Sequence, residues 1–213
     1  STGVINNQRT TGAGVLTMAT GASIDAGAGD ILFRIDAGTG KTYNQAGDMT
    51  LGTITAGTVR ALYGTTVGNI YTNGIITATG TGDAILFNSG ANYINNYGAG
   101  ALVTPAGRWL IYSDHSNYTQ LNGLSPDFSY NNCTYSGGCS VAIPGTGNGV
   151  LYEYAPHLLA ITVNTSRAYG DANPTNAALQ SLYTYSGFEN GDDVNDLDVL
   201  PTATIASSAD SLA

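Results

Sequence analysis

The stretch 107–113, Gly-Arg-Trp-Leu-Ile-Tyr-Ser, contains the only tryptophan of the chain and separates two parts of different composition. The part before it consists of short apolar runs rich in Gly, Ala and Thr with few charges. The part after it holds both cysteines, both histidines and five of the six prolines. The β-favouring residues of the stretch predict a strong strand. We therefore predict a structural junction here, with Arg108, Trp109 and Tyr112 as its main residues.

The overall composition indicates an ordered all-β protein. The 213 residues include 29 glycines but only 6 prolines, and 42% are apolar, which excludes collagen and argues against disorder. Charged residues make up 10%, and the net charge is -9. Such a surface repels phosphate groups, so we expect neither nucleic-acid nor membrane-surface binding. No apolar run is long enough to predict membrane insertion. Because the chain starts at Ser1 without a leader, we expect a removed leader or a fragment of a longer polypeptide.

The part before the junction contains a degenerate repeat. Each unit is a glycine, usually a polar residue, and then a short β-favouring run, and the units begin between fourteen and twenty-one residues apart. They lie at 14–18, 29–33, 47–51, 68–72 and 82–87. Short strands with glycine corners fit stacked coils, so we predict a right-handed parallel β-helix over residues 1–112. Its two ends would expose unpaired strand edges that need a cap or a neighbouring subunit.

Residues 113–158 lack the regularly spaced glycines of the repeat. They are predicted to form a connector that caps the last coil. Cys133 and Cys139 enclose a short polar loop, with no second cysteine pair or nearby histidine to complete a zinc site. We predict a local disulfide formed in an oxidising compartment. Two free buried cysteines in a cytosolic protein are the alternative.

The first 158 residues resemble a known group of exoproteins. The resemblance is carried by Gly29-Asp30-Ile31, by Gly47-Asp48-Met49, by the Gly-Arg-Trp junction, by Gly-Thr-Gly-Asn-Gly at 145–149 and by Tyr152. Together these features resemble filamentous-haemagglutinin-type exoproteins of bacterial two-partner secretion, over residues 14 to 158. The resemblance implies an extracellular protein of the bacterial cell surface that acts in adhesion.

The last part carries two further motifs, Tyr-Gly-Asp-Ala-Asn-Pro at 169–174 and Ser-Gly-Phe-Glu-Asn-Gly-Asp at 186–192. They resemble the glycine-rich MBG module of bacterial adhesins, which implies a small, mainly-β, sandwich-like module over residues 159–213. The module residues carried over are Tyr169, Gly170, Asp171, Asn173, Pro174, Gly187, Gly191 and Asp192. Residues 175–180 look like an insertion of one helical turn, and the closing strand expected after Ser208 is missing.

Two explanations account for the missing strand. The chain is truncated, or a strand from another subunit completes the module and gives a head-to-tail homopolymer. The donor in the second case is the apolar segment from Thr10 to Ala19. The residues predicted to take part in strand addition are Thr10, Gly14, Val15, Leu16, Met18, Thr202, Thr204 and Ile205.

Candidate chemical sites are few. Asp114, His115 and Ser116 have the residue types of a hydrolytic triad, but adjacent residues on one loop cannot face one another as that mechanism requires. His157 is expected to have a packing or solvent-facing role. Four acidic residues near the C-terminus offer oxygen ligands and are weak calcium candidates, although their spacing does not match an EF-hand loop. They are Asp192, Asp193, Asp196 and Asp198. No other cofactor is expected.

Three classes of function remain from the sequence. We predict a secreted structural and adhesive protein without catalytic activity, a subunit of a fibre or biofilm matrix, whose partners are itself, other surface proteins or extracellular polysaccharide. The second class is a glycan-binding module, because the 14 tyrosines could form an aromatic surface with polar tips. The third is a carbohydrate-active enzyme on a β-helix.

Overall fold

The computed structural model describes residues 14–36, 46–64, 67–154, 159–161, 174–188 and 194. The chain divides into two compact units, Ser1–Ala155 and Pro156–Ala213. The predicted all-β class is confirmed, because the described residues form mainly strands, most of them in parallel sheets. The described helical elements are the 3-10 turn η1 (Ser116–Tyr118) and the helix α1 (Asn176–Gln180).

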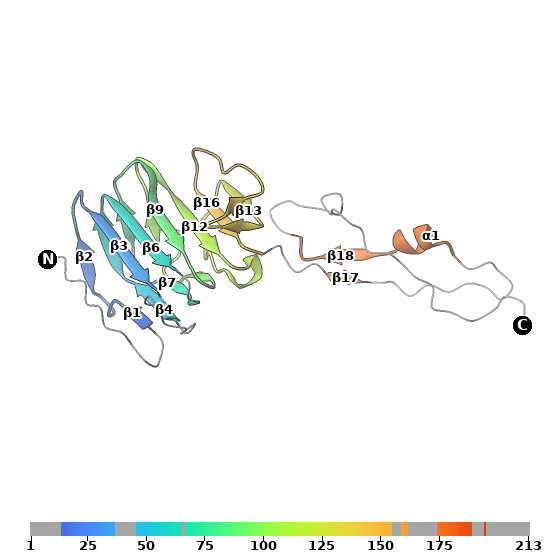
Figure 1. Cartoon of the computed structure of the whole chain (residues 1–213), viewed down its shortest axis with the longest axis horizontal. Coiled ribbons are helices and arrows are strands. Elements are labelled where there is room, and N and C mark those ends of the chain that lie inside the picture. Colours follow the sequence, from blue (N-terminus) through green and yellow to red (C-terminus); the bar gives the residue numbers. More distant parts are fainter. Residues whose placement is uncertain are drawn as a thin grey trace, which may run out of the picture. The chain divides into compact units, whose positions relative to one another are not determined.

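Three parallel sheets build the first unit (Figure 1). The first sheet contains β1 (Gly14–Thr17), β4 (Ala46–Leu51), β7 (Ile70–Thr72) and β10 (Tyr93–Asn95). The second contains β2 (Ser23–Asp25), β5 (Thr53–Ala56), β8 (Ile76–Ala78) and β11 (Leu102–Val103). The third has the order β13 (Phe128–Tyr130), β16 (Gly149–Tyr152), β12 (Gly107–Ser113), β9 (Gly82–Asn88), β6 (Thr58–Tyr63) and β3 (Asp30–Ile35). The chain therefore visits the three sheets in turn and returns one strand further along each time.

Alternating side chains give this unit its core. In β6 every second residue is buried, as expected for a strand with one face turned inward. Equivalent residues of successive coils lie in register, as in the row Val59, Ile85 and Trp109, and each is at most 3% exposed. Close packing between coils also explains a corner glycine. A Cβ at Gly107 would lie 2.6 Å from the carbonyl oxygen of Gly80, so a larger residue does not fit.

The junction strand β12 lies inside the third sheet and does not end it. It pairs with β9 on one side and with β16 on the other. The sequence placed the end of the coils at residue 112 and predicted a connector at 113–158 that caps the last coil. In the structure, the described residues 113–154 belong to the same unit as the coils. β16 occupies the position next to β12, and β13, although earlier in the chain, lies beyond it.

A short cover lies over the outer face of this end of the third sheet. The hairpin of β14 (Cys133–Thr134) and β15 (Gly138–Cys139) is closed by the Cys133–Cys139 disulfide, with an S–S distance of 2.04 Å. Cys133 packs with Tyr112 and Leu151, which point away from the main core. The predicted disulfide is therefore confirmed, and its hairpin explains why β12 and β16 are buried on both faces.

The second unit is described only in part. β17 (Leu159–Ile161) pairs antiparallel with β18 (Thr184–Ser186). The one helical turn predicted at 175–180 appears as α1, and the Thr175 hydroxyl caps it by accepting a hydrogen bond from the Ala178 N–H at 3.2 Å. Of the predicted module residues, Pro174 and Gly187 are described, with Gly187 at a positive φ of 95°. Tyr169, Gly170, Asp171, Asn173, Gly191 and Asp192 lie outside the described residues.

Candidate functional site

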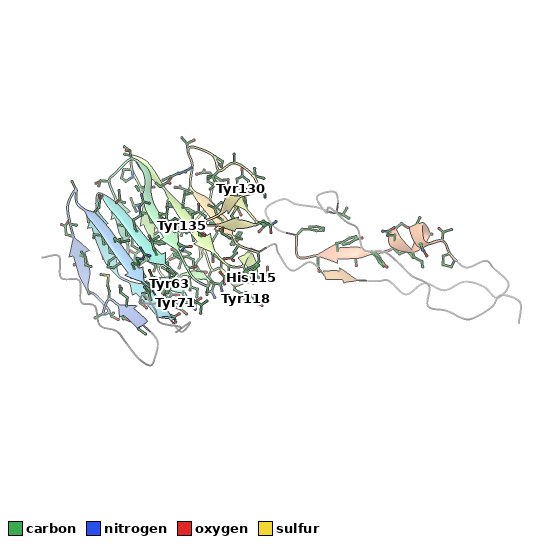
Figure 2. All side chains as sticks on the ribbon, in the orientation of Figure 1. Tyr63, Tyr71, His115, Tyr118, Tyr130 and Tyr135 are labelled. Carbon is green, nitrogen blue, oxygen red and sulfur yellow. A yellow bond between two sulfur atoms is a disulfide. The ribbon has the colours of Figure 1, made fainter. Side chains whose placement is uncertain are left out.

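Polar side chains gather at the corner that is formed by the carboxyl ends of the strands of the third sheet. Parallel strands end at the same edge of a sheet, so residues at the ends of β6, β9, β12 and β16 come together there. A groove of about 270 Å³ opens at this corner. Its floor and one wall come from the strand ends, including Tyr63, Asn88, Ser89 and Glu153, and its other wall comes from residues 134–136 of the disulfide loop. Tyr63 and Tyr135 are labelled in Figure 2.

Hydrogen bonds within and between coils hold the floor of the groove in place. The Asn88 side chain donates to the carbonyl oxygen of Tyr63 at 2.8 Å. The Ser89 hydroxyl donates to the carbonyl oxygen of Ala91 at 3.0 Å. The Tyr63 hydroxyl donates to the carbonyl oxygen of Gly47 at 2.9 Å, and its burial raises the pKa of the phenol. The floor is therefore formed before any ligand arrives.

The opposite wall presents an aromatic side chain on a closed loop. Tyr135 lies at the tip of the hairpin and is 44% exposed. Its ring meets the ring of Tyr112 edge-on, with centroids 5.4 Å apart and planes at 76°. The Thr134 hydroxyl accepts a hydrogen bond from the Gly137 N–H at 2.9 Å, which tightens the turn. The disulfide and this turn fix Tyr135 against the sheet while leaving much of its surface open.

The groove is electronegative. Glu153 lines it, and Asp114 lies on the neighbouring strand end, where the Tyr154 N–H donates to the Asp114 carbonyl oxygen at 3.0 Å. Burial, and then the charge of Glu153, raise the pKa of the Asp114 carboxyl to about 6. None of the described lining residues is Lys or Arg. The cation Arg108 lies at the opposite end of β12 and is held by Asp83 at 2.5 Å and by the carbonyl oxygen of Pro144.

A ladder of polar residues runs along a neighbouring corner and ends beside the groove. The Asn69 N–H donates to Asp48 Oδ1 at 2.9 Å, the Asn92 N–H donates to Asn69 Oδ1 at 3.0 Å, and the His115 N–H donates to Asn92 Oδ1 at 3.3 Å. Sequence reasoning missed this ladder. Its signal was a polar residue inside β4 and directly before β7 and β10, namely Asp48, Asn69 and Asn92, at a spacing close to one coil.

The histidine at the end of the ladder packs between tyrosines. The His115 ring stacks on Tyr154 with centroids 4.7 Å apart, and Tyr118 meets it edge-on at 5.7 Å (Figure 2). The Ser116 hydroxyl instead donates to Asn117 Oδ1 at 3.2 Å. Asp114 and His115 lie between β12 and η1, and Ser116 begins η1. His157 lies outside the described residues.

A second candidate site is the open first coil, which consists of β1, β2 and β3. Each of these strands is the last of its sheet among the described residues, so one edge of each has no neighbour there. Apolar side chains of this coil are only partly buried, whereas those of the next coil, such as Met49 and Val59, are 0% exposed. The partly buried residues are Leu16, Met18, Ile31, Phe33 and Ile35.

The residues predicted for strand addition fall partly on this coil. Gly14, Val15 and Leu16 lie in β1, where Val15 is 63% exposed. Met18 follows β1, and its sulfur accepts a hydrogen bond from the Gly52 N–H at 3.3 Å. Thr10, Thr202, Thr204 and Ile205 lie outside the described residues.

The weak calcium candidates Asp192, Asp193, Asp196 and Asp198 also lie outside the described residues. Within the part of the chain that the structure describes, no three His, Cys, Asp or Glu side chains gather in a way that could hold a metal ion. In the same part, no helix has the length and apolar character needed to cross a bilayer.

The fold and both sites have to be interpreted from their own geometry, because no family model, curated protein or solved structure matches this chain.

Proposed function

We propose that this chain is a secreted structural and adhesive protein of the bacterial surface, and that its first unit is a right-handed parallel β-helix that assembles head to tail with further copies. The handedness follows the rule that crossovers between parallel strands are right-handed in about 98% of cases. The disulfide and the low content of charged residues support an extracellular location.

The observation that carries the proposal is the order of the third sheet. β3 and β13 lie at its opposite ends, and all of its strands are parallel. A second copy stacked on the first coil would therefore place its β13 beside β3 in the same direction, which continues the sheet. Such a contact uses two different surfaces and repeats without closing, so it produces a filament. It would also cover the partly exposed apolar residues of the first coil, among them Phe33.

Assembly needs no chemical step, and we assign the chain no catalytic role. The residue types of a triad at 114–116 point to different partners, with the His115 ring on Tyr154 and the Ser116 hydroxyl on Asn117. Burial of apolar surface and pairing of strand edges provide the free energy of association.

The test is a substitution that places a charged side chain at the open end of the core, in the first coil. In Phe33→Lys the lysine can reach solvent in the free protein, but a stacked copy would bury it at a cost of several kcal/mol. We expect filaments or large oligomers of the wild type by electron microscopy and sedimentation velocity, and monomers of 21.8 kDa for the variant. Val141→Lys is the matched control, because Val141 is 55% exposed and lies outside the first coil. A wild type that stays monomeric at high concentration, or equal assembly of both variants, would overturn the proposal.

A further inference from the structure

The groove beside the disulfide loop combines features that suit a hydroxyl-rich ring. One wall is the exposed face of an aromatic side chain, Tyr135, on which the apolar face of a sugar can stack. The floor offers the amide of Asn88, and the far side offers the carboxylate of Glu153. A few polar groups that converge around an apolar surface are typical of small-ligand sites.

The charges of the corner select among such ligands. Glu153 lines the groove and Asp114 lies close enough for their charges to interact. None of the three cations of the third sheet lines the groove. Arg34 is paired with Asp36, Arg108 is engaged by Asp83 and Pro144, and Arg60 lies in β6. An acidic sugar would meet the Glu153 carboxylate, with the charge of Asp114 behind it, and no counter-charge among the described lining residues. A protonated amine would instead donate a charge-assisted hydrogen bond to a carboxylate, which is about twice as strong as a neutral one.

The size of the groove sets the length of the ligand that it can hold. Its volume of about 270 Å³ lies just below the range of about 300–1,000 Å³ that is typical of pockets for drug-sized ligands, so it suits a single sugar ring. Because the groove is open at the surface, the rest of a chain can extend into solvent.

We propose that the groove formed by Tyr135, Asn88 and Glu153 binds one ring of a saccharide that carries a protonated amino group. Tyr135 stacks on the ring, Asn88 binds a hydroxyl group, and Glu153 binds the amine. The disulfide and the bonds of the floor hold these groups in place, so little conformational entropy is lost on binding. The first unit thereby binds a basic polysaccharide, and this binding does not depend on contacts between copies.

The direct test measures binding by isothermal titration calorimetry with four probes of equal length. They are a glucosamine tetramer, its fully N-acetylated form, a galacturonate tetramer and a lysine tetrapeptide. We expect the glucosamine tetramer to bind at least ten times more tightly than the acetylated form, and the galacturonate tetramer not to bind. The lysine peptide distinguishes recognition of a sugar from attraction to a protein of net charge -9. Peptide binding equal to that of the glucosamine tetramer would overturn the proposal, as would the absence of glucosamine binding.

Two variants locate the site. Tyr135→Ala removes the stacking wall and should weaken glucosamine binding about tenfold, because a tenfold change corresponds to about 1.4 kcal/mol, within the range of one aromatic contact. Glu153→Gln should abolish the preference for the amine over the acetylated probe while keeping the remaining affinity. Tyr97→Ala is the matched control, since Tyr97 is 48% exposed but does not line the groove.

Unchanged binding by Tyr135→Ala, with a melting curve like that of the wild type, would contradict the proposal. The monomeric variant Phe33→Lys should bind the glucosamine tetramer as tightly as the wild type. A failure of assembly can therefore be distinguished from a failure of this site.

Discussion

At the scale of single residues, Asp114 is the group whose charge should matter most for stability. Its pKa lies near 6 in the folded protein, above the ordinary value of 3.8. The folded state therefore holds this proton more tightly than the unfolded state does. The resulting stabilisation is fully present below about pH 4 and is lost as the pH rises through 6.

Asp114→Asn should accordingly unfold at a higher denaturant concentration than the wild type at pH 7 and at a similar concentration at pH 3.5. The reason is that asparagine resembles the protonated acid and has no repulsion with Glu153. Urea unfolding of both proteins between pH 3.5 and 8 measures the difference. A wild type more stable than the variant at pH 7 would mean that the carboxylate is stabilised by its surroundings.

Gly107 shows how closely neighbouring coils approach. An added Cβ would meet the carbonyl oxygens of Gly80 and Gly82 at 2.6 and 2.7 Å, and backbone atoms cannot move aside as a flexible side chain can. We expect Gly107→Ala to lower the free energy of unfolding by about 1–3 kcal/mol. Gly145→Ala is the control, since nothing lies within 4 Å of its Cβ position, and it should change stability by less than about 0.5 kcal/mol. Chemical denaturation of the two variants compares them, and equal losses would show that the crowding is relieved by a shift of the coil.

At the scale of elements, the polar ladder should contribute to stability through the side-chain oxygens that accept its hydrogen bonds. Asn92 Oδ1 accepts the hydrogen bond of the His115 N–H, and no other atom of the Asn92 side chain is needed for that contact. Asn92→Ala should therefore cost about 1 kcal/mol, and Asn92→Asp should restore most of the loss because it keeps the acceptor. Thermal melting gives the comparison, with Thr146→Ala, at an exposed position away from the ladder, as the neutral reference. If the aspartate variant is as unstable as the alanine variant, packing and not the hydrogen bond is responsible.

The disulfide should stabilise the hairpin of β14 and β15 and leave the stability of the coils unchanged. Closing this short loop is worth about 2 kcal/mol by the chain-entropy relation, and the hairpin belongs to the smaller cluster with Tyr112 and Leu151 and not to the main core. In a Cys133→Ser, Cys139→Ser double variant we expect faster hydrogen exchange across residues 131–140 and unchanged protection in β6 and β9. Binding of the glucosamine tetramer should weaken as well, because Tyr135 is no longer held. Uniform loss of protection throughout the coils would show that the hairpin supports the whole unit.

Part of the fold followed from the sequence because it depends on local pattern. The runs at 29–33, 47–51 and 82–87 coincide with β3, β4 and β9, where a glycine and a polar residue precede a short β-favouring run. The order of β16 and β13 could not be predicted in this way. The residues of the two strands do not determine which strand lies next to β12. That position depends on how the segment between them folds over the sheet.

The groove could not be predicted from the sequence for a related reason. Tyr63, Asn88 and Glu153 are far apart in the chain and meet only through the register of the coils. Tyr135 reaches them because the hairpin folds back on the outer face, and the two cysteines predicted the hairpin closure but not the face that it covers. The open first coil was more accessible to prediction, because any stack of coils must expose an edge at its end.

At the scale of the whole molecule, the position of the boundary decides which fragments fold. The sequence placed boundaries after residues 112 and 158, and the contacts of the chain divide it after Ala155. A chain ending at Ala155 keeps β16 and its buried residues Val150 and Leu151, so its melting temperature should lie within about 3 °C of the full chain, equivalent to about 1 kcal/mol.

A chain ending at Tyr112 should behave differently. It loses β16, which pairs with β12, and it exposes the outward side chains that the hairpin covers. Because each coil is stabilised by its neighbours, the last coil would then have one neighbour and a long apolar edge. We expect this fragment to aggregate or to melt well below the longer one, as measured by circular dichroism and light scattering. A soluble, cooperatively melting fragment 1–112 would instead mean that β13 and β16 add little to the coils, and the sequence boundary would be the energetically relevant one.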